Sequence, residues 1–210
     1  MCGIFGVHTH HKAVSTIIQG WKALEYRGYD SSGLAVLQKA DIVTRRAEGK
    51  IENLEVLLEQ QPISGVIGIG HTRWATHGTP TTDNAHPHRF KDVVVVHNGI
   101  IENHHILKQQ LIERGHHFTS QTDSEVIPHM IQQYLDLGYS QTDAIAATLE
   151  QLEGSYAVGI LIRQTPNTIY AARNASPLAI GESEDGLLLA SDALALSSFT
   201  QKVYYPDENQ

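Results

Sequence analysis

The sequence predicts an α+β protein in which two packed β-sheets are layered with helices. Strand-like and helical segments come in blocks without regular strand–helix alternation, which argues against a doubly wound parallel sheet. The 210 residues suit one domain, because domains usually span about 50 to 250 residues. Apolar residues make up 41% of the chain and charged residues 18%, a balance typical of globular proteins.

Short apolar runs rich in β-favouring residues predict the strands. The first run begins at Cys2, and several others are apolar throughout, as expected of strands that are buried on both faces. The predicted strands cover residues 2–7, 33–37, 66–70, 93–96, 156–162, 168–172 and 187–190. This number of strands suits two sheets.

Helices are predicted where apolar residues recur at helical spacing, in residues 13–26, 103–114, 124–137 and 140–152. The last segment opens with Ser140, a residue type that caps helix N-termini. Residues 72–92 are polar, show little periodicity and contain two prolines, which predicts a long surface loop. The Arg, Trp and His content of this loop favours a functional role.

Charge and hydropathy exclude several classes of partner. The formal net charge is −8, from 15 Lys and Arg against 23 Asp and Glu, so neither nucleic acid nor an anionic membrane is expected to bind. No apolar stretch approaches the roughly 20 residues that span a bilayer, and the N-terminus lacks a leader pattern, so we expect a cytoplasmic protein. The single cysteine excludes an internal disulfide and makes a reactive thiol worth considering.

Cys2 is a candidate nucleophile at the start of the chain. Removal of the initiator methionine would leave this residue with a thiol and a free α-amine, whose reference pKa values lie near 8.5 and 8. The amine can then accept a proton as the sulfur attacks, so no separate catalytic histidine is required. While Met1 remains, that nitrogen is an amide, and processing is therefore expected to switch the activity on. The alternative is that Cys2 merely begins a strand.

Five segments resemble those of class II glutamine amidotransferases, a branch of the N-terminal-nucleophile hydrolases. They are CGIFG (residues 2–6), YRGYDSSGLA (26–35), HTRWATHG (71–78), NAHPH (84–88) and VVHNGIIEN (95–103), and the similarity extends through nearly the whole chain. The resemblance implies that residues 1–210 form one glutaminase domain, a four-layer αββα sandwich. It also implies hydrolysis of L-glutamine to glutamate and ammonia, without a cofactor.

Within this family, the segments are most similar to the branch that transfers the ammonia to fructose 6-phosphate and forms glucosamine 6-phosphate. Other branches typically carry Arg-Gly-Gln or Arg-Gly-Pro where this chain has Arg27-Gly-Tyr. This branch implies a C-terminal sugar-phosphate isomerase domain outside these residues and a homo-oligomeric full-length enzyme. Two alternatives stay open: a stand-alone N-terminal-cysteine hydrolase of another amide, and an inactive domain that senses glutamine.

A site for glutamine needs a cation for the α-carboxylate, an anion for the α-ammonium and an anchored nucleophile. The planar guanidinium of Arg73 suits a carboxylate, and the resemblance assigns it that role. The resemblance also assigns hydrogen bonds at the amino-acid end to Thr76 and His77, and the ammonium contact to Asp123. Position alone favours helix capping for Asp123. Trp74 is expected either to help cover the pocket or simply to pack.

Attack on a carboxamide places negative charge on its oxygen, so fixed hydrogen-bond donors are needed there. The side-chain amide of Asn98 and the backbone N–H of Gly99 are the candidates, and the family resemblance supports them. A tight Asn-Gly turn is the alternative. Arg27 is expected to orient the terminal amine or to form a structural salt bridge. No metal is expected, because no cysteine or close carboxylate completes a zinc set among the 13 histidines.

Overall fold

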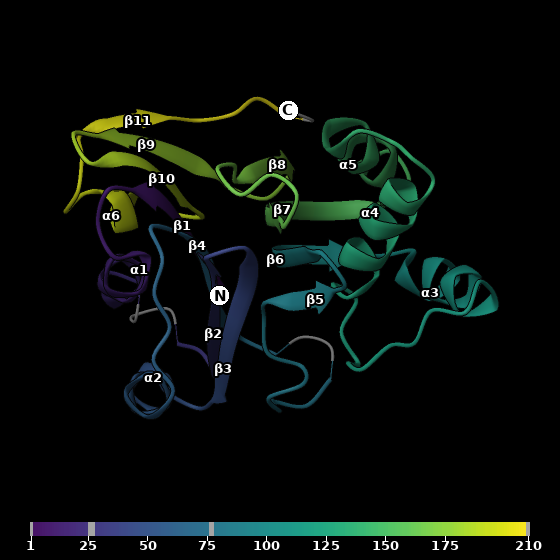
Figure 1. The fold of residues 1–210 in the computed structure, drawn as a ribbon, viewed down its shortest axis with the longest axis horizontal. Coiled ribbons are helices and arrows are strands. Elements are labelled where there is room, and N and C mark those ends of the chain that lie inside the picture. The colour runs from purple at the N-terminus through teal and green to yellow at the C-terminus, as the bar shows by residue number, and fades with distance from the viewer. Residues whose placement is uncertain (1, 25–27, 76–77, 209–210) are drawn as a thin grey trace.

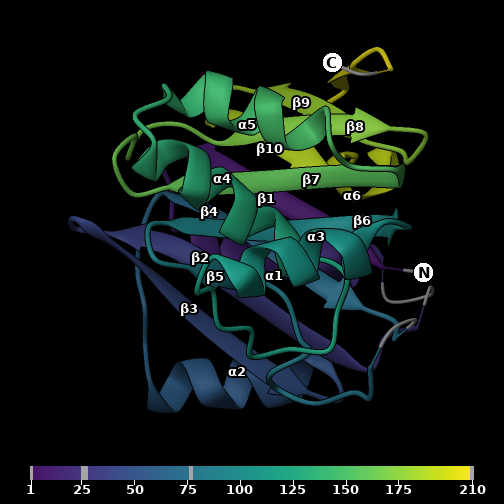
Figure 2. The same ribbon diagram turned by 90° about the vertical axis from the view of Figure 1, so that its right-hand side faces the viewer.

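Two β-sheets lie face to face between two layers of helices in the computed structural model, which describes residues 2–24, 28–75 and 78–208 (Figure 1). The helices of one layer are α1 (Ala13–Lys22), α2 (Ile51–Gln60) and α6 (Ala193–Leu196); those of the other are α3 (His104–Glu113), α4 (Val126–Asp136) and α5 (Gln141–Leu149). Figure 2 shows this second layer in front of its sheet. The predicted α+β, four-layer architecture is confirmed.

The larger sheet has seven strands and contains the N-terminal strand near its middle. In spatial order they are β11 (Lys202–Tyr204), β9 (Ala179–Ser183), β10 (Gly186–Ala190), β1 (Gly3–Thr9), β4 (Ile67–Arg73), β2 (Ser31–Gln38) and β3 (Asp41–Glu48). All pairings between these strands are antiparallel. Gly3 pairs with Thr72, so Cys2 lies beside the end of β4.

The smaller sheet has four antiparallel strands, β5 (His88–Phe90), β6 (Val93–Ile101), β7 (Gly154–Ile162) and β8 (Tyr170–Asn174), in that spatial order. The long β6–β7 pair forms its centre. Asn98 pairs with Ala157 and Gly99 with Tyr156, so both predicted oxyanion donors lie within a strand.

Period-two alternation along the strands produces three apolar clusters. Between the sheets, Ile69 of β4 packs with Val94 and Val96 of β6, while Val93 and Val95 face the α3–α5 layer. The opposite face of β4 carries glycines, and a Cβ built on Gly70 would lie 2.4 Å from the ring of Trp21 in α1. Glycine on this face therefore permits α1 to approach the sheet closely.

The seven predicted strands correspond to β1, β2, β4, β6, β7, β8 and β10, and the four predicted helices to α1, α3, α4 and α5. The side chain of Ser140 caps α5 by accepting from the N–H of Asp143, as predicted. The prediction omits β3, β9, β11, α2 and α6. The predicted loop 72–92 is partly wrong, because β4 continues to Arg73 and β5 pairs with β6. The end of the first predicted helix, residues 25–26, lies outside the described residues.

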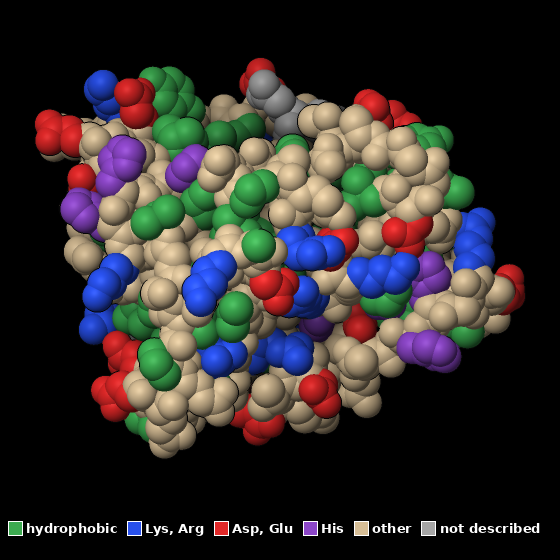
Figure 3. All heavy atoms as spheres, viewed as in Figure 1, with side chains coloured by type: hydrophobic (Ala, Val, Ile, Leu, Met, Phe, Trp, Pro, Cys, Tyr) green, Lys and Arg blue, Asp and Glu red, His purple; other side chains and the backbone are tan. Residues whose placement is uncertain are grey.

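Opposite charges are interspersed on the face of the molecule shown in Figure 3. Three of the basic side chains, Arg89, Lys91 and Arg163, are each paired with an aspartate at 2.9, 2.6 and 2.5 Å. Among the described helices, none is both long and apolar enough to cross a membrane.

Candidate active site

A pocket of about 460 Å³ opens where the ends of β1 and β4 in one sheet meet β6 in the other. Its lining combines several of the predicted site residues with residues that the sequence did not single out. The lining consists of Cys2, Arg73, Trp74, His86, His97, Asn98, Gly99, Ile100, Thr122, Asp123, Ser124, Ser155, Ser176 and Pro177. Cys2, Arg73, Trp74, Asn98, Gly99 and Asp123 are thus brought together as predicted.

Cys2 lies directly before β1, and its thiol contacts the backbone at the end of β4. The N–H of Trp74 donates to Sγ at 3.3 Å, and Sγ lies 3.6 Å from the Trp74 carbonyl oxygen, which accepts from the thiol. Burial raises the pKa of the Cys2 thiol, although the Trp74 N–H and the positive charge of Arg73 act in the opposite direction. The thiol is therefore protonated at neutral pH.

Arg73 is the last residue of β4 and is buried. Its guanidinium donates to the carbonyl oxygens of Gly78 and Thr79, at 3.3 and 3.5 Å, in the segment that follows the strand. A buried arginine at the lip of a pocket is the residue type suited to a carboxylate.

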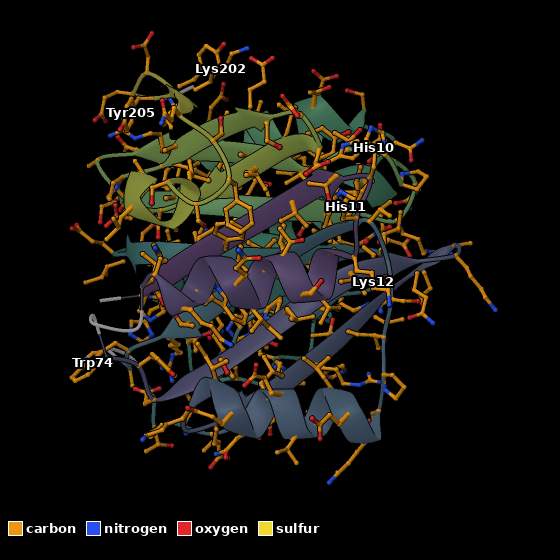
Figure 4. All side chains as sticks on the ribbon, turned by 90° about the vertical axis from the view of Figure 1, so that its left-hand side faces the viewer. His10, His11, Lys12, Trp74, Lys202 and Tyr205 are labelled. Atoms are coloured by element: carbon orange, nitrogen blue, oxygen red, sulfur yellow. The ribbon has the colours of Figure 1, made fainter. Side chains whose placement is uncertain are left out.

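Unlike the buried Arg73, Trp74 is exposed. Although it is a large apolar residue, 53% of its surface is accessible. Figure 4 shows it at one end of the molecule, with His10 and Lys12 at the other end. The indole packs against Gly28, where a Cβ would lie 2.8 Å from the ring. Trp74 also lines the pocket, so the covering role and the packing role both stay predictions.

Asp30 anchors the segment that follows Arg73, a contact that the sequence did not predict. Its N–H donates to the Arg73 carbonyl at 2.8 Å, and its carboxylate accepts from the N–H of Ala75 at 2.5 Å. These two bonds join the start of β2 to the backbone on both sides of Trp74. They fix the position of the backbone that contacts Cys2.

Asn98 and Gly99 lie within β6, so the alternative of a tight Asn-Gly turn is wrong. The Asn98 amide nitrogen donates to the Cys2 carbonyl oxygen at 3.3 Å, and its oxygen lies 2.8 Å from His71 Nε2. Gly99 has a φ of +130°, and a Cβ there would lie 2.0 Å from the Ser155 carbonyl oxygen. Only glycine fits this position.

Asp123 is buried in the pocket wall and does not cap a helix, so that alternative is also wrong. Helix α4 begins at Val126, after an N-cap residue that makes no side-chain capping bond. The Asp123 carboxylate instead accepts from the N–H of Ile101 at 2.8 Å and from the Ser124 hydroxyl at 3.4 Å. The bond from Ile101 joins the loop before α4 to the end of β6.

The loop that carries Asp123 is organised by Glu125. The carboxylate of Glu125 accepts from the N–H and the hydroxyl of Thr119, both at 2.9 Å, and from the N–H of Ser120 at 2.6 Å. Burial alone would raise the pKa of Glu125, but the nearby His129 Nε2, at 3.7 Å, and hydrogen bonds from Ser120 and Thr119 outweigh it and hold the pKa well below its usual range. Glu125 is thus an ionised anchor for the loop.

Four buried histidines lie around the pocket floor. The ring of His86 lies 4.1 Å from that of His71 and 4.5 Å from that of His88. Burial lowers the pKa of His71 and His88 to about 3 and also lowers those of His86 and His97. All four are therefore neutral near pH 7. Within the described part of the chain, no group of three His, Cys, Asp or Glu is placed to hold a metal ion.

Sequence reasoning did not assign His71, His86 or His97 to the site. For His71, the available signal was a polar residue in an apolar strand. It lies on the same face of β4 as Ile67, Ile69 and Arg73. Three predicted site residues, Arg27, Thr76 and His77, lie outside the described residues.

Two packed antiparallel sheets with a cysteine at the head of a central strand are the arrangement expected of an N-terminal-nucleophile hydrolase. The chain belongs to the glutamine amidotransferase family, because a family described as "Glutamine amidotransferase domain" matches residues 71–198. This match confirms the resemblance to glutamine amidotransferases that the sequence motifs indicated.

Curated relatives of known name are similar over almost the entire chain. A glutamine--fructose-6-phosphate aminotransferase (isomerizing) of Zymomonas mobilis is 47% identical over 208 residues, which is 99% of this chain and 34% of the relative. The enzyme of the same name from Bradyrhizobium diazoefficiens is 48% identical over 208 residues, again 99% of this chain and 34% of the relative. The chain therefore spans about a third of the length of these relatives.

Solved structures show the same architecture. A glutamine phosphoribosylpyrophosphate amidotransferase from B. subtilis superposes with a TM-score of 0.82 and 28% identity, covering 99% of this chain and 45% of that one. A structure described as the allosteric regulatory enzyme of purine biosynthesis gives a TM-score of 0.85, with the same identity and coverage. This chain is more similar in sequence to the fructose-6-phosphate aminotransferases.

Proposed function

We propose that this chain hydrolyses L-glutamine to glutamate and ammonia with Cys2 as the nucleophile. The observation that carries the proposal is the shared pocket of the Cys2 thiol, the Asn98 amide and the Gly99 backbone. A nucleophile beside fixed hydrogen-bond donors is what attack on a carboxamide requires. Membership of the glutamine amidotransferase family supports glutamine as the substrate.

The pocket also offers opposite charges for the amino-acid end of glutamine. Arg73 is proposed to bind the α-carboxylate through its planar fork, and Asp123 to bind the α-ammonium. On the strength of the sequence resemblance, Thr76 and His77 would add hydrogen bonds at this end, and Arg27 would orient the terminal amine. Trp74, at the edge of the pocket, would cover the bound substrate.

In the first step the Cys2 sulfur bonds to the carboxamide carbon while the thiol proton passes to the free α-amine of Cys2. A base is required because the thiolate is the nucleophile, so the thiol must lose its proton as it attacks. Negative charge develops on the carbonyl oxygen, where Asn98 Nδ2 and the Gly99 N–H would donate to it. The carbon–nitrogen bond then breaks, and ammonia departs with a proton from the terminal ammonium.

A glutamyl thioester remains on Cys2 after ammonia has left. Water attacks the thioester carbon and gives up a proton to the terminal amine, which now acts as a base again. The carbon–sulfur bond breaks, the sulfur regains a proton, and glutamate is released. One group thus serves as base and acid in both halves of the cycle.

The destination of the ammonia is proposed from the relatives. Their printed name assigns them a glutamine--fructose-6-phosphate aminotransferase activity, and the chain matches 34% of their length. We propose that these 210 residues form the glutaminase domain of such an enzyme. A sugar-phosphate isomerase domain beyond the matched segment would convert fructose 6-phosphate to glucosamine 6-phosphate in a homo-oligomeric enzyme.

Labelling with an electrophilic glutamine analogue tests the nucleophile. Wild-type protein is expected to gain one adduct on Cys2, found by mass spectrometry and peptide mapping, and to release ammonia from glutamine. Cys2→Ala should form no adduct and release no ammonia. Ammonia release by Cys2→Ala, or an adduct on another residue, would remove Cys2 from the mechanism.

Substrate comparison separates the two alternative functions. A hydrolase of other amides would act equally on glutamine and on glutamine derivatives with a blocked amine or carboxylate. A sensing domain would bind glutamine in calorimetry without releasing ammonia, and intact mass would show retained Met1. The proposed glutaminase should discriminate strongly against both blocked derivatives, because each leaves one charged pocket residue without its partner.

A further inference from the structure

The side chain of Asn98 is held between two partners that come from different strands. On one side, its amide nitrogen lies 3.3 Å from the carbonyl oxygen of Cys2. On the other, its amide oxygen lies 2.8 Å from Nε2 of His71, which is a short contact for a neutral pair. The amide therefore has a defined direction, and both of its ends contact the protein.

Donor and acceptor chemistry permits one consistent assignment of this chain of contacts. A carbonyl oxygen only accepts, so the end of the amide that faces Cys2 must be the NH₂ group. The oxygen then faces His71, and an oxygen can only be bonded there if Nε2 carries the proton. His71 must therefore be the Nε2–H tautomer, with Nδ1 unprotonated.

The surroundings of His71 agree with that tautomer. Nδ1 is buried and has no hydrogen-bond partner among the described residues, and an unpaired buried acceptor is tolerated better than an unpaired N–H. The residue itself is fixed, because it lies in β4 and pairs with Ile4 of β1 and Gly33 of β2. The imidazole is fully buried.

We propose that His71 is a positioning residue that sets the direction of the Asn98 amide, an inference that rests on the proposed glutaminase function. With Nε2–H bonded to the oxygen, the NH₂ group faces Cys2, and its second hydrogen is available to the substrate oxygen. A reversed amide would present its own oxygen to the developing oxyanion, and the two would repel each other. Because its Nε2–H is committed to Asn98, His71 does not act as the catalytic base.

Two substitutions at position 71 separate positioning from simple packing. In His71→Gln the side-chain NH₂ can reach the place of Nε2, whereas in His71→Asn the amide is too short to do so. His71→Asn is expected to lower kcat for glutamine hydrolysis by about 10- to 100-fold with little change in KM, and His71→Gln to restore most of kcat. Equal losses in the two variants, or a loss confined to KM, would overturn the proposal.

A double-mutant cycle tests whether His71 acts through Asn98. Asn98→Ala removes the amide, so adding His71→Asn to it should cost no further kcat. If the two losses multiply, His71 has an independent role and the proposal fails. Thermal unfolding of all four proteins shows whether the comparison is between folded states.

Nitrogen-15 NMR of the histidine rings tests the tautomer without reference to activity. In wild-type protein at neutral pH, His71 Nε2 should resonate as a protonated ring nitrogen and Nδ1 as an unprotonated one. The reverse pattern would overturn the proposal even in an active enzyme. A protein with the expected tautomer but no ammonia release would instead refute the proposed function, so the two failures are distinguishable.

Discussion

At the scale of single residues, the surroundings of Cys2 explain why its own terminal amine is the proposed base. The thiol is half-buried, burial raises its pKa, and its hydrogen bonds within the described residues are both with the Trp74 backbone. The histidines that line the pocket, His86 and His97, have lowered pKa values and are weak bases. A base carried on Cys2 itself would be adjacent to the sulfur whatever the substrate pose.

Asn98→Ala should reduce the rate of glutamine hydrolysis more than it reduces glutamine binding. Loss of one oxyanion donor typically lowers kcat by about 10² to 10³, or roughly 3 to 4 kcal/mol. Steady-state kinetics would give kcat and KM separately. An unchanged kcat with a raised KM would show that the amide contributes to ground-state binding instead.

At the scale of elements, the pocket depends on polar anchors between segments rather than on any one helix or strand. The loop before α4 is held by Glu125, and its Asp123 is joined to β6 through the N–H of Ile101. The segment after β4 is joined to β2 through Asp30. Each anchor is a carboxylate that accepts from backbone N–H groups, which fixes a loop at low cost in side-chain freedom.

Glu125→Gln should make the free energy of unfolding less sensitive to pH under acidic conditions. A depressed carboxyl pKa contributes stability above the unfolded value, near 4.3, and that stability is lost as pH falls toward the folded pKa. Below about pH 5, the free energy of unfolding should therefore fall more steeply in wild type, by at most about 1.4 kcal/mol per pH unit. Denaturant titrations from pH 3 to pH 7, at about one-unit steps, would measure both slopes. Parallel slopes would contradict the anchoring role.

Gly20→Ala should destabilise the protein although alanine favours helices. A Cβ at Gly20 in α1 would lie 2.4 Å from the ring of Phe5 in β1. Overpacking costs about 1 to 3 kcal/mol, which exceeds the gain of at most about 1 kcal/mol from helix propensity. Gln19→Ala, at the exposed neighbouring position, is the matched control. Thermal melts in which Gly20→Ala is the more stable variant would show that α1 can move away from the sheet.

At the scale of the whole molecule, the pocket lies where the two sheets meet, and its lining includes the candidate nucleophile Cys2 and both candidate oxyanion donors. We therefore expect the 210-residue chain alone to release ammonia from glutamine. Fructose 6-phosphate should leave that rate unchanged, because the proposed sugar site lies beyond the matched segment. A coupled glutamate assay with and without the sugar phosphate tests this, and a strict requirement for the sugar would contradict it.

Much of the architecture could be predicted because strands and helices leave local patterns. The apolar runs of β6 and β7 and the Ser140 cap of α5 are visible along the chain, and α2 carries Ile51, Leu54 and Leu58 at helical spacing that the prediction overlooked. In contrast, β5, β9 and β11 are short and depend on pairing with neighbours. Such segments have little pattern of their own to recognise.

The sequence by itself determined the family and pointed to the candidate nucleophile and the candidate donor pair in β6, because these depend on residue types in fixed local order. Tertiary structure decided which polar groups meet: Cys2 with Trp74, 72 residues away; His71 with Asn98, 27 away; and Asp123 with Ile101, 22 away. These contacts arise from packing one sheet on another and a loop on a strand end. Hydrogen bonds across such distances in sequence leave no periodic signal, since their geometry exists only once the layers have packed.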